Sequence, residues 1–383
     1  MNAIKLFSFL SITWVLLISN PVKADTIPKQ IHVIKIDTIK SFLSLLSQNN
    51  PITIPLENDI IDEIKRHIRH RVKYYNNRKM TFRYYFAMFE HFLSEANLPT
   101  MLKYVPVVES MLKPKAVSRA GATGLWQFMY STGLKNNLNY NSYVDDRMDP
   151  VKSTIAATKY LNKLYGYYND WALALAAYNA GPGNVRKAIK KSGGKVNFWK
   201  IRKYLPKETY NYVPKFIATM YLIEFSKEYG IENLNDKRLF RDITTLPVKE
   251  MVDLNSLSNF LQIPIDTVKF YNPAFKHDII PFEKDNENLL TLPKKNIEQL
   301  KNSEEDFYIF SRKQFKLREG SLPDFYTMNS RTTYKVRSGD YLGKIAKKFG
   351  VKISDLRKWN NFKSDIIYVN QKIVVYPKKI PVN

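Results

Sequence analysis

The spacing of apolar residues predicts that the first part of the chain is helical. Over residues 59–96 the apolar positions recur every three to four residues, the period of an amphipathic α-helix. A second helix is predicted to begin near Met101 and to end at Lys113-Pro114, because proline disfavours the helical conformation in the residue before it. Within it, Pro106 either kinks the helix or marks its first turn. Residues 25–58 combine prolines with short apolar runs and look irregular.

Capping residues predict where the later helices begin. Asp149 followed by Pro150 is typical of an N-cap and a first helical position, so a helix is expected over residues 151–168. Asp170 is expected to cap the next helix in the same way, and that helix stops at Gly181. Up to about residue 230 the chain is therefore predicted to be nearly all helical.

The pattern changes after the last long predicted helix, which lies within residues 206–229. Residues 231–250 are charged and look irregular. Two later segments, 257–293 and 342–377, repeat each other weakly, each reading helix, short break, helix, loop with Asp-Ile-Ile, strand and proline. Internal repetition of this kind predicts a duplicated module. Between the two copies, residues 302–331 are polar and are interpreted as a linker.

Composition adds a strong constraint on partners. The chain has 383 residues, a formal net charge of +25 and 44% hydrophobic residues, enough for two or three domains with buried cores. The charge favours an anionic partner, such as nucleic acid, a lipid surface or an anionic polymer. A solvated basic surface without a dedicated partner explains it equally well. The lack of cysteine excludes disulfides, thiolate metal sites, a cysteine nucleophile and a lipid-bearing N-terminal cysteine.

The first 24 residues have the layout of a secretory signal peptide. One lysine precedes an apolar run of 14 residues at 6–19, and Val22-Lys23-Ala24 resembles a cleavage site. The run is shorter than the roughly 20 residues that span a bilayer, although an uncleaved N-terminal anchor is an alternative. No later segment approaches a membrane span in length and apolarity. Export weakens the nucleic-acid interpretation of the charge and favours a polymer of the cell envelope.

The strongest candidate for chemistry is Glu109. It lies in VVESMLKPKAVSRAGATGLWQFM, residues 107–129, and is the single acidic residue within 96–144. Its apolar neighbours Val107 and Val108 suggest that its carboxyl group is desolvated, which raises the pKa and keeps the proton bound near neutral pH. Such an acid can protonate a sugar leaving group. Most single glutamates are solvated or cap helices, so the case rests on the neighbouring residues.

Those neighbours suit a sugar ligand. Gly121-Ala122-Thr123-Gly124 allows a tight loop, and it lacks the lysine-Ser/Thr ending of a phosphate-binding loop. Gln127 and Asn179 offer amide donors and acceptors for hydroxyl and acetamide groups. Trp126 and Phe128 could face a sugar, but core packing is the favoured interpretation for both.

Glycoside hydrolysis normally needs two carboxylates. Only Asp145, Asp146 and Asp149 are near Glu109 in sequence, and Asp149 is better explained as a helix cap. With one good acid and no obvious partner, attack by a hydroxyl group of the substrate itself gains weight.

Here the residues support a family resemblance. Glu109-Ser110, AVSRAGATGLWQFM (116–129) and AAYNAGPGNV (176–185) occur in the order typical of the lytic transglycosylases of glycoside hydrolase family 23, and the chain resembles that family over about residues 80–225. The resemblance implies a mainly α, lysozyme-like helical domain that cleaves the MurNAc-β-1,4-GlcNAc bond of peptidoglycan. Glu109 matches the family's single acid/base, which protonates the glycosidic oxygen and then deprotonates the MurNAc C6 hydroxyl to give a 1,6-anhydro end. No metal or cofactor is implied.

The resemblance also implies binding residues. It places five residues in the substrate cleft: Ser118, Gln127, Met129, Tyr178 and Asn179. Of these, Ser118 and Tyr178 are expected to hydrogen-bond the catalytic carboxyl or the MurNAc acetamide. The sequence departs from the family at Tyr130, where proline is usual. It also lacks the lipobox cysteine of the membrane-bound members, so a location in the periplasm, or attachment to the wall through other modules, is expected.

Residues 334–377 resemble a LysM domain, a small α+β unit of order β-α-α-β that binds GlcNAc-containing chains. Asn370 replaces a usual glycine in the last turn, which asparagine tolerates because it adopts left-handed conformations. Residues 332–383 hold 12 Lys/Arg against 3 Asp/Glu, so a generic basic tail is the alternative. Residues 251–293 resemble a degenerate LysM-like unit without the opening Gly-Asp, and sugar binding is not expected there.

The signal-peptide pattern and the family resemblance together imply an exported, monomeric peptidoglycan lytic transglycosylase. A lysozyme- or chitinase-type hydrolase is the nearest alternative, and a second carboxylate near Glu109 would favour it. A non-catalytic wall-binding protein and a nucleic-acid binder are the others. The expected order is a signal peptide (1–24), a helical extension (25–80), the lysozyme-like domain (81–230), a LysM-like segment (231–301), a linker (302–331) and a LysM domain (332–383).

Overall fold

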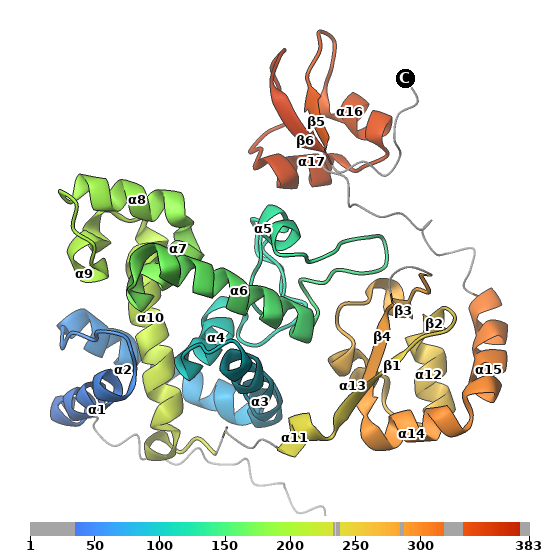
Figure 1. Cartoon of the computed structure of the whole chain (residues 1–383), viewed down its shortest axis with the longest axis horizontal. Helices are drawn as coiled ribbons and strands as arrows, with labels where there is room; N and C mark the ends of the chain where they lie inside the picture. The colour runs from blue at the N-terminus through green and yellow to red at the C-terminus, as the bar shows by residue number, and fades with distance from the viewer. Residues whose placement is uncertain (1–34, 233, 235–237, 284–286, 318–331, 376–383) are drawn as a thin grey trace, which may run out of the picture.

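The computed structural model describes residues 35–232, 234, 238–283, 287–317 and 332–375 (Figure 1). The predicted signal peptide and residues 318–331 of the predicted linker lie outside the described residues. A helical domain comes first in the chain, followed by two small α+β modules. The prediction of a mainly α domain followed by LysM-type modules is confirmed. In the described residues, no helix is both long and apolar enough to cross a bilayer.

The helical domain is built around a buried helix, α10. Its elements are α1 (Ile36–Asn49), α2 (Asn58–Asn77), α3 (Lys79–Glu95), η1 (Thr100–Tyr104), α4 (Val105–Ser110), α5 (Tyr130–Lys135), α6 (Pro150–Tyr168), α7 (Trp171–Ala180), α8 (Pro182–Lys191), α9 (Phe198–Ile201), η2 (Arg202–Tyr204), α10 (Lys207–Glu224), η3 (Ser226–Tyr229) and α11 (Arg238–Arg241). Helix α10 is buried along most of its length and packs against α2, α4 and α7. Large aromatic side chains, such as Tyr104, Trp126 and Tyr221, fill the core around this helix. Because α10 contacts helices from several parts of the domain, it holds the domain together.

The predicted helix caps are confirmed. The Asp149 carboxylate accepts hydrogen bonds from the backbone N–H groups of Val151 (2.9 Å) and Lys152 (2.8 Å) at the start of α6. Asp170 accepts one from Leu173 (2.8 Å) at the start of α7. Each such cap satisfies donors that a helix terminus otherwise leaves unpaired.

Two predictions in this domain are wrong in detail. Residues 25–58 are not irregular throughout, because α1 occupies Ile36–Asn49 and buries Ile39, Leu43 and Leu46 on one face. The helix expected to end at Lys113-Pro114 ends earlier, at Ser110, where Met111 takes a left-handed conformation with φ 53°. Pro106 marks the first turn of α4 and does not kink it.

The first module, here called the LysM-like module, contains two small antiparallel sheets. Its elements are β1 (Ile243–Pro247), β2 (Val252–Asp253), α12 (Leu254–Leu261), α13 (Ile265–Tyr271), η4 (Lys276–Asp278), β3 (Ile279–Ile280), β4 (Leu289–Pro293), α14 (Lys294–Asn302) and α15 (Glu304–Lys316). Strand β1 pairs with β4, and β2 pairs with β3. Two predictions here are wrong. Residues 231–250 are not irregular, since they contain β1, and the proposed linker begins with α15, which buries Phe307 in the module's core.

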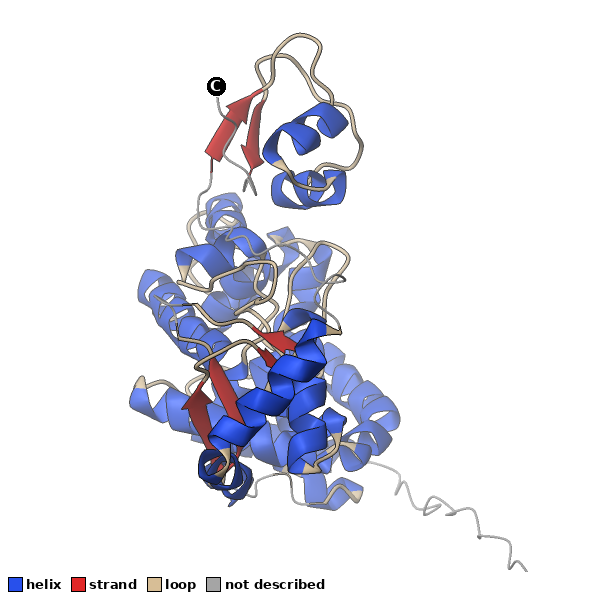
Figure 2. Cartoon of the chain, turned by 90° about the vertical axis from the view of Figure 1, so that its right-hand side faces the viewer, coloured by secondary structure: helices blue, strands red, loops and turns tan. Residues whose placement is uncertain are grey.

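The second module, the LysM module, has the predicted order β-α-α-β. It consists of β5 (Thr332–Lys335), α16 (Leu342–Phe349), α17 (Ile353–Asn360) and β6 (Lys372–Val375), with β5 and β6 antiparallel (Figure 2). Asn370 has φ 69°, which confirms the left-handed turn expected where asparagine replaces glycine.

The weak sequence repeat between the two modules is matched by equivalent hydrogen bonds in the structure. In the LysM-like module Asn272, just after α13, donates to the carbonyls of Val268 (2.9 Å) and Thr291 (2.7 Å) and accepts from the Thr291 N–H (2.9 Å). Asn360, at the end of α17, makes the same three bonds with Leu356 and Val374, at 2.8, 2.8 and 2.7 Å. An equivalent asparagine therefore connects the second helix of each module to a strand of that module.

The caps give a first prediction. Replacing Asp170 by alanine is expected to lower the free energy of unfolding of the helical domain by about 1 kcal/mol, because the Leu173 N–H loses its partner. Asp62→Ala is the matched control, since Asp62 is exposed on α2 and its ion pair with Lys65 spans 3.9 Å. Urea unfolding followed by circular dichroism measures both, and equal midpoints would contradict the capping role.

Candidate active site

Glu109 lies near the end of the short helix α4, which the 3-10 turn η1 leads into. The residue is partly buried among apolar neighbours. Burial raises the pKa of its carboxyl group to about 7, and the negative charge of Glu208 acts in the same direction, whereas a hydrogen bond from Tyr212 lowers it. This is the direction expected from the sequence. A carboxyl group with this pKa can both donate and accept a proton near neutral pH.

Tyr212 is the direct partner of this carboxyl group. Its hydroxyl donates to Oε1 of Glu109 at 2.6 Å from the first half of α10. Burial, together with the adjacent Glu109, raises the pKa of Tyr212 well above its usual value, so the phenol keeps its proton and remains a donor. The bond fixes one carboxyl oxygen.

Tyr178, on α7, is also close to Glu109 but makes a different bond. Its hydroxyl donates to the backbone carbonyl of Trp126 at 2.7 Å. Burial raises the pKa of Tyr178 well above its usual value, and the charge of Glu109 contributes to this shift. Tyr178 therefore stands beside the carboxyl group and holds the Trp126 backbone in place.

The loop before α5 is shaped by its own hydrogen bonds. Ser118 Oγ accepts from the Ala122 N–H at 3.0 Å and closes the turn that contains Gly121. The Gln127 side chain donates to the carbonyls of Gly124 (2.9 Å) and Ala116 (3.3 Å). Met129 then forms the N-cap of α5. Three predicted binding residues are thus brought together on one loop, held by backbone contacts.

Gly124 is required by close packing in this loop. It has φ 89°, and a Cβ atom there would lie 1.7 Å from the carbonyl oxygen of Arg147. The fifth predicted binding residue, Asn179, accepts a hydrogen bond from the Thr209 hydroxyl at 2.7 Å and ties α7 to the start of α10. Trp126 and Phe128 are buried, and Trp126 Nε1 donates to the Thr154 hydroxyl at 2.9 Å, so their predicted core role is confirmed.

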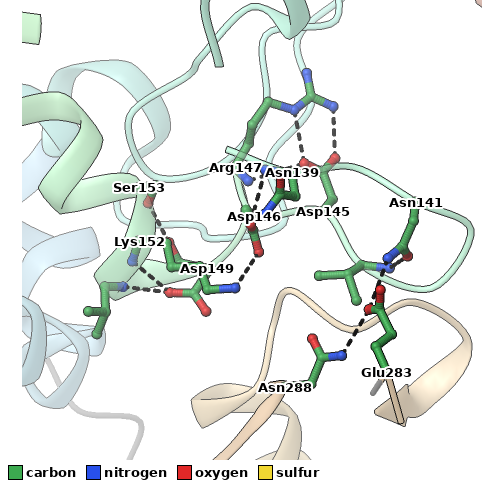
Figure 3. A network of polar contacts seen from close by, with 12 residues as sticks. Asn139, Asn141, Asp145, Asp146, Arg147, Asp149, Lys152, Ser153, Glu283 and Asn288 are labelled. Atoms are coloured by element: carbon green, nitrogen blue, oxygen red, sulfur yellow. Dashed lines mark hydrogen bonds and ion pairs between the residues drawn. The ribbon is translucent and has the colours of Figure 1, made fainter. Parts of the chain in front are cut away.

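The nearby aspartates have structural partners (Figure 3). Asp145 binds the guanidinium of Arg147 through both oxygens, at 2.9 and 2.7 Å. Asp146 accepts from Lys152 Nζ at 2.9 Å and from the Asn139 N–H at 3.0 Å, and Asp149 caps α6. All three carboxylates that were candidates for a second catalytic acid are therefore engaged in hydrogen bonds or ion pairs within the fold.

Sequence reasoning missed Tyr212 and Glu208 as site residues. Both belong to LPKETYNYVPK, residues 205–215, a segment far from Glu109 in the sequence, in which no local pattern singles out either residue. Tyr212 is 103 residues from Glu109 in the sequence, and no local pattern pairs them.

Comparisons with known proteins identify the family to which the chain belongs. Models of the Transglycosylase SLT domain, of the LysM-like domain of lytic transglycosylase MltD and of the LysM domain match residues 87–200, 242–309 and 334–375. The chain is 32% identical over 323 residues to the membrane-bound lytic murein transglycosylase D of Escherichia coli K12, covering 83% of this chain and 69% of that one. It is 57% identical over 44 residues to the probable peptidoglycan endopeptidase LytE of Bacillus subtilis 168, covering 12% and 13% of the two chains.

Among solved structures, the 70 kDa soluble lytic transglycosylase of Escherichia coli matches with 27% identity and a TM-score of 0.32, over 39% of this chain and 25% of that one. The family resemblance seen in the sequence is confirmed by the identity to transglycosylase D over most of the chain. The chain therefore belongs to the lytic murein transglycosylases, as a member with an SLT domain followed by LysM-like and LysM domains.

Proposed function

We propose that the protein cleaves the MurNAc-β-1,4-GlcNAc bond of peptidoglycan without water and leaves a 1,6-anhydroMurNAc end. The observation that carries this proposal is the Glu109 carboxyl group, with a pKa of about 7 and one oxygen fixed by Tyr212. The family to which the chain belongs supports the substrate class.

The proposed reaction uses Glu109 twice. The protonated carboxyl first gives its proton to the glycosidic oxygen as the bond from C1 to that oxygen breaks. The resulting carboxylate then takes the proton of the MurNAc C6 hydroxyl, whose oxygen bonds to C1. The carboxyl group is thereby restored, and no water is consumed. A pKa near the working pH suits a group that must act as acid and then as base.

We also propose that the LysM module attaches the enzyme to the wall. Its loops expose large apolar side chains, including Tyr341 (63% exposed) and Tyr368 (71% exposed), which can pack on sugar faces. The net charge of +25 suits a polymer that carries carboxylates. Both the exposed tyrosines and the positive charge fit an exported protein that works on the wall, in the periplasm or envelope.

A hydrolase is the second candidate, and Glu208 is the observation that favours it. Its carboxylate is exposed and close enough to Glu109 for its charge to raise the pKa of that group. A second carboxylate could act as the base that activates water. Mass spectrometry of the products distinguishes the two routes, because anhydro ends resist borohydride and hydrolysis leaves reducing ends.

Glu109→Gln is expected to lower release of muropeptides from purified sacculi by at least about 100-fold, because amide replaces the acid/base. Glu95→Gln is the matched control, since Glu95 is exposed at the end of α3. Anhydro products from the parent and almost none from the variant are the expected result. Near-parental turnover by Glu109→Gln would remove Glu109 from the mechanism.

The pH dependence of kcat/KM should report the Glu109 pKa. Activity is expected to fall as pH rises through about 7, where the acid loses its proton. Tyr212→Phe removes a bond that lowers the pKa, so this limb should move to higher pH. Glu208→Gln removes a charge that raises it, so the limb should move to lower pH. Tyr210→Phe, on the exposed side of α10, is the control, and identical profiles would contradict the proposed tuning.

Wall attachment can be tested on the exposed tyrosines. The double change Tyr341→Ala and Tyr368→Ala should reduce sedimentation of the protein with purified sacculi, because it removes apolar surface offered to the glycan. Tyr167→Ala removes another exposed tyrosine (51%), from α6, and should leave sedimentation unchanged. Equal loss in both variants would mean that the LysM tyrosines have no special role.

A further inference from the structure

The LysM module contacts the helical domain beside the loop that carries the predicted binding residues. Trp359 of α17 packs on Tyr130, the first residue of α5, with ring centroids 6.1 Å apart. The two rings share a small apolar cluster with Leu134, Tyr140 and Val374. Tyr130 is buried by these contacts and is the position where proline is usual in the family.

A second contact lies on the loop itself. The aliphatic chain of Lys358, next to Trp359, crosses Gly121 so closely that a Cβ atom at Gly121 would lie 2.3 Å from Lys358 Cε. Gly121 has φ 86° and closes the turn held by Ser118. The glycine therefore leaves room for the lysine of the other domain.

Electrostatics show how closely the two domains meet. Burial lowers the pKa of Lys358, the positive charge of Arg147 lowers it further, and Asp145 opposes both. Arg147 in turn lies over the rings of Tyr130 (5.5 Å) and Tyr140 (5.7 Å) and donates to the carbonyl of Gly121 (3.2 Å). Arg147 thus joins Gly121, Tyr130 and Tyr140 into one surface of the helical domain, and Lys276 of the LysM-like module also lies over the Tyr140 ring, at 3.5 Å.

The LysM-like module provides an internal parallel. Its Tyr271 precedes Asn272, as Trp359 precedes the equivalent Asn360. Tyr271 packs edge-on against Tyr84 of α3, with centroids 5.4 Å apart. Both copies of the duplicated unit therefore present the aromatic residue at the same helix end to the helical domain.

We propose that the LysM module docks on the surface formed by Gly121, Tyr130 and Tyr140, and so holds a bound glycan strand at a fixed position relative to Glu109. The role of the docking rests on the proposed function, while the docking itself does not. The contact is small, but it forms within one chain, where effective concentrations reach the millimolar range. A module held in this way guides cleavage of long strands, whereas a short glycan gains nothing from it.

The chain has no cysteine, so two introduced cysteines can be labelled specifically. Spin labels at Lys190→Cys on α8 and Lys363→Cys after α17, both exposed, report the distance between the domains by double electron–electron resonance. One narrow distance peak is expected. Tyr130→Ala and, from the other side, Trp359→Ala should each broaden it, and Tyr341→Ala, on the LysM module away from the contact, should not.

A broad distribution in the parent, or a narrow peak that survives both contact variants, would overturn the proposal. Circular dichroism shows whether each variant is folded. Because Tyr130 lies in the helical domain and Trp359 in the LysM module, the test still stands if one of the two variants fails to fold. Trp359→Ala should also cleave sacculi more slowly than the parent while cleaving short soluble glycans equally fast. The distance measurement needs no catalysis, so failure of the transglycosylase proposal would leave it intact.

Discussion

The buried ion pair of Asp145 and Arg147 is the interaction on which the arrangement of the three domains depends. The two side chains are 2% and 3% exposed, and the Arg147 guanidinium also donates to the carbonyls of Gly121 (3.2 Å) and Phe128 (3.4 Å), at two points of the loop before α5. The Asp145 N–H binds the Ala274 carbonyl of the LysM-like module at 3.0 Å, and Arg147 underlies the rings that receive the LysM module. These contacts link the shape of the loop to the position of both modules. Removing one partner of a buried ion pair costs roughly 3–5 kcal/mol, so the loop and both modules depend on this pair.

Glu109, unlike Asp145, is a buried carboxyl group without a basic partner among the described residues. Its carboxyl group has no cationic partner among the influences on its pKa, so desolvation outweighs the Tyr212 hydrogen bond and the pKa rises. The folded protein consequently holds this proton more tightly than the unfolded chain does. The free energy of unfolding therefore falls as the pH rises from about 4.5 to about 7, and the full penalty is present above that. The domain tolerates that penalty because α10, which carries Tyr212, is anchored by the rest of the core.

Sequence patterns predicted what depends on neighbouring residues. The caps at Asp149 and Asp170, the left-handed Asn370 and the desolvated Glu109 all follow from residue type and immediate context. Features that depend on distant partners were missed. Helix α1 becomes stable because Ile39 and Leu43 are buried against the rest of the domain, and α15 because Phe307 completes another core. Tyr212 was missed for the same reason, since only the fold brings it to Glu109.

The two modules show how one unit can take two roles. The LysM-like module adds backbone pairing to its aromatic contact, with Val144 and Phe275 bridged and the Lys276 N–H bound to the Tyr143 carbonyl at 2.7 Å. Its Phe270 and Tyr271 pack against the core of the helical domain, and its Phe275 packs in the core of the module itself. Between the described residues of the LysM module and those of the helical domain there is no backbone–backbone hydrogen bond, and Tyr341 and Tyr368 are exposed to solvent. The copy without the opening Gly-Asp turn is thus joined to the helical domain by backbone pairing, whereas the copy with Gly339-Asp340 keeps exposed aromatic side chains in its loops.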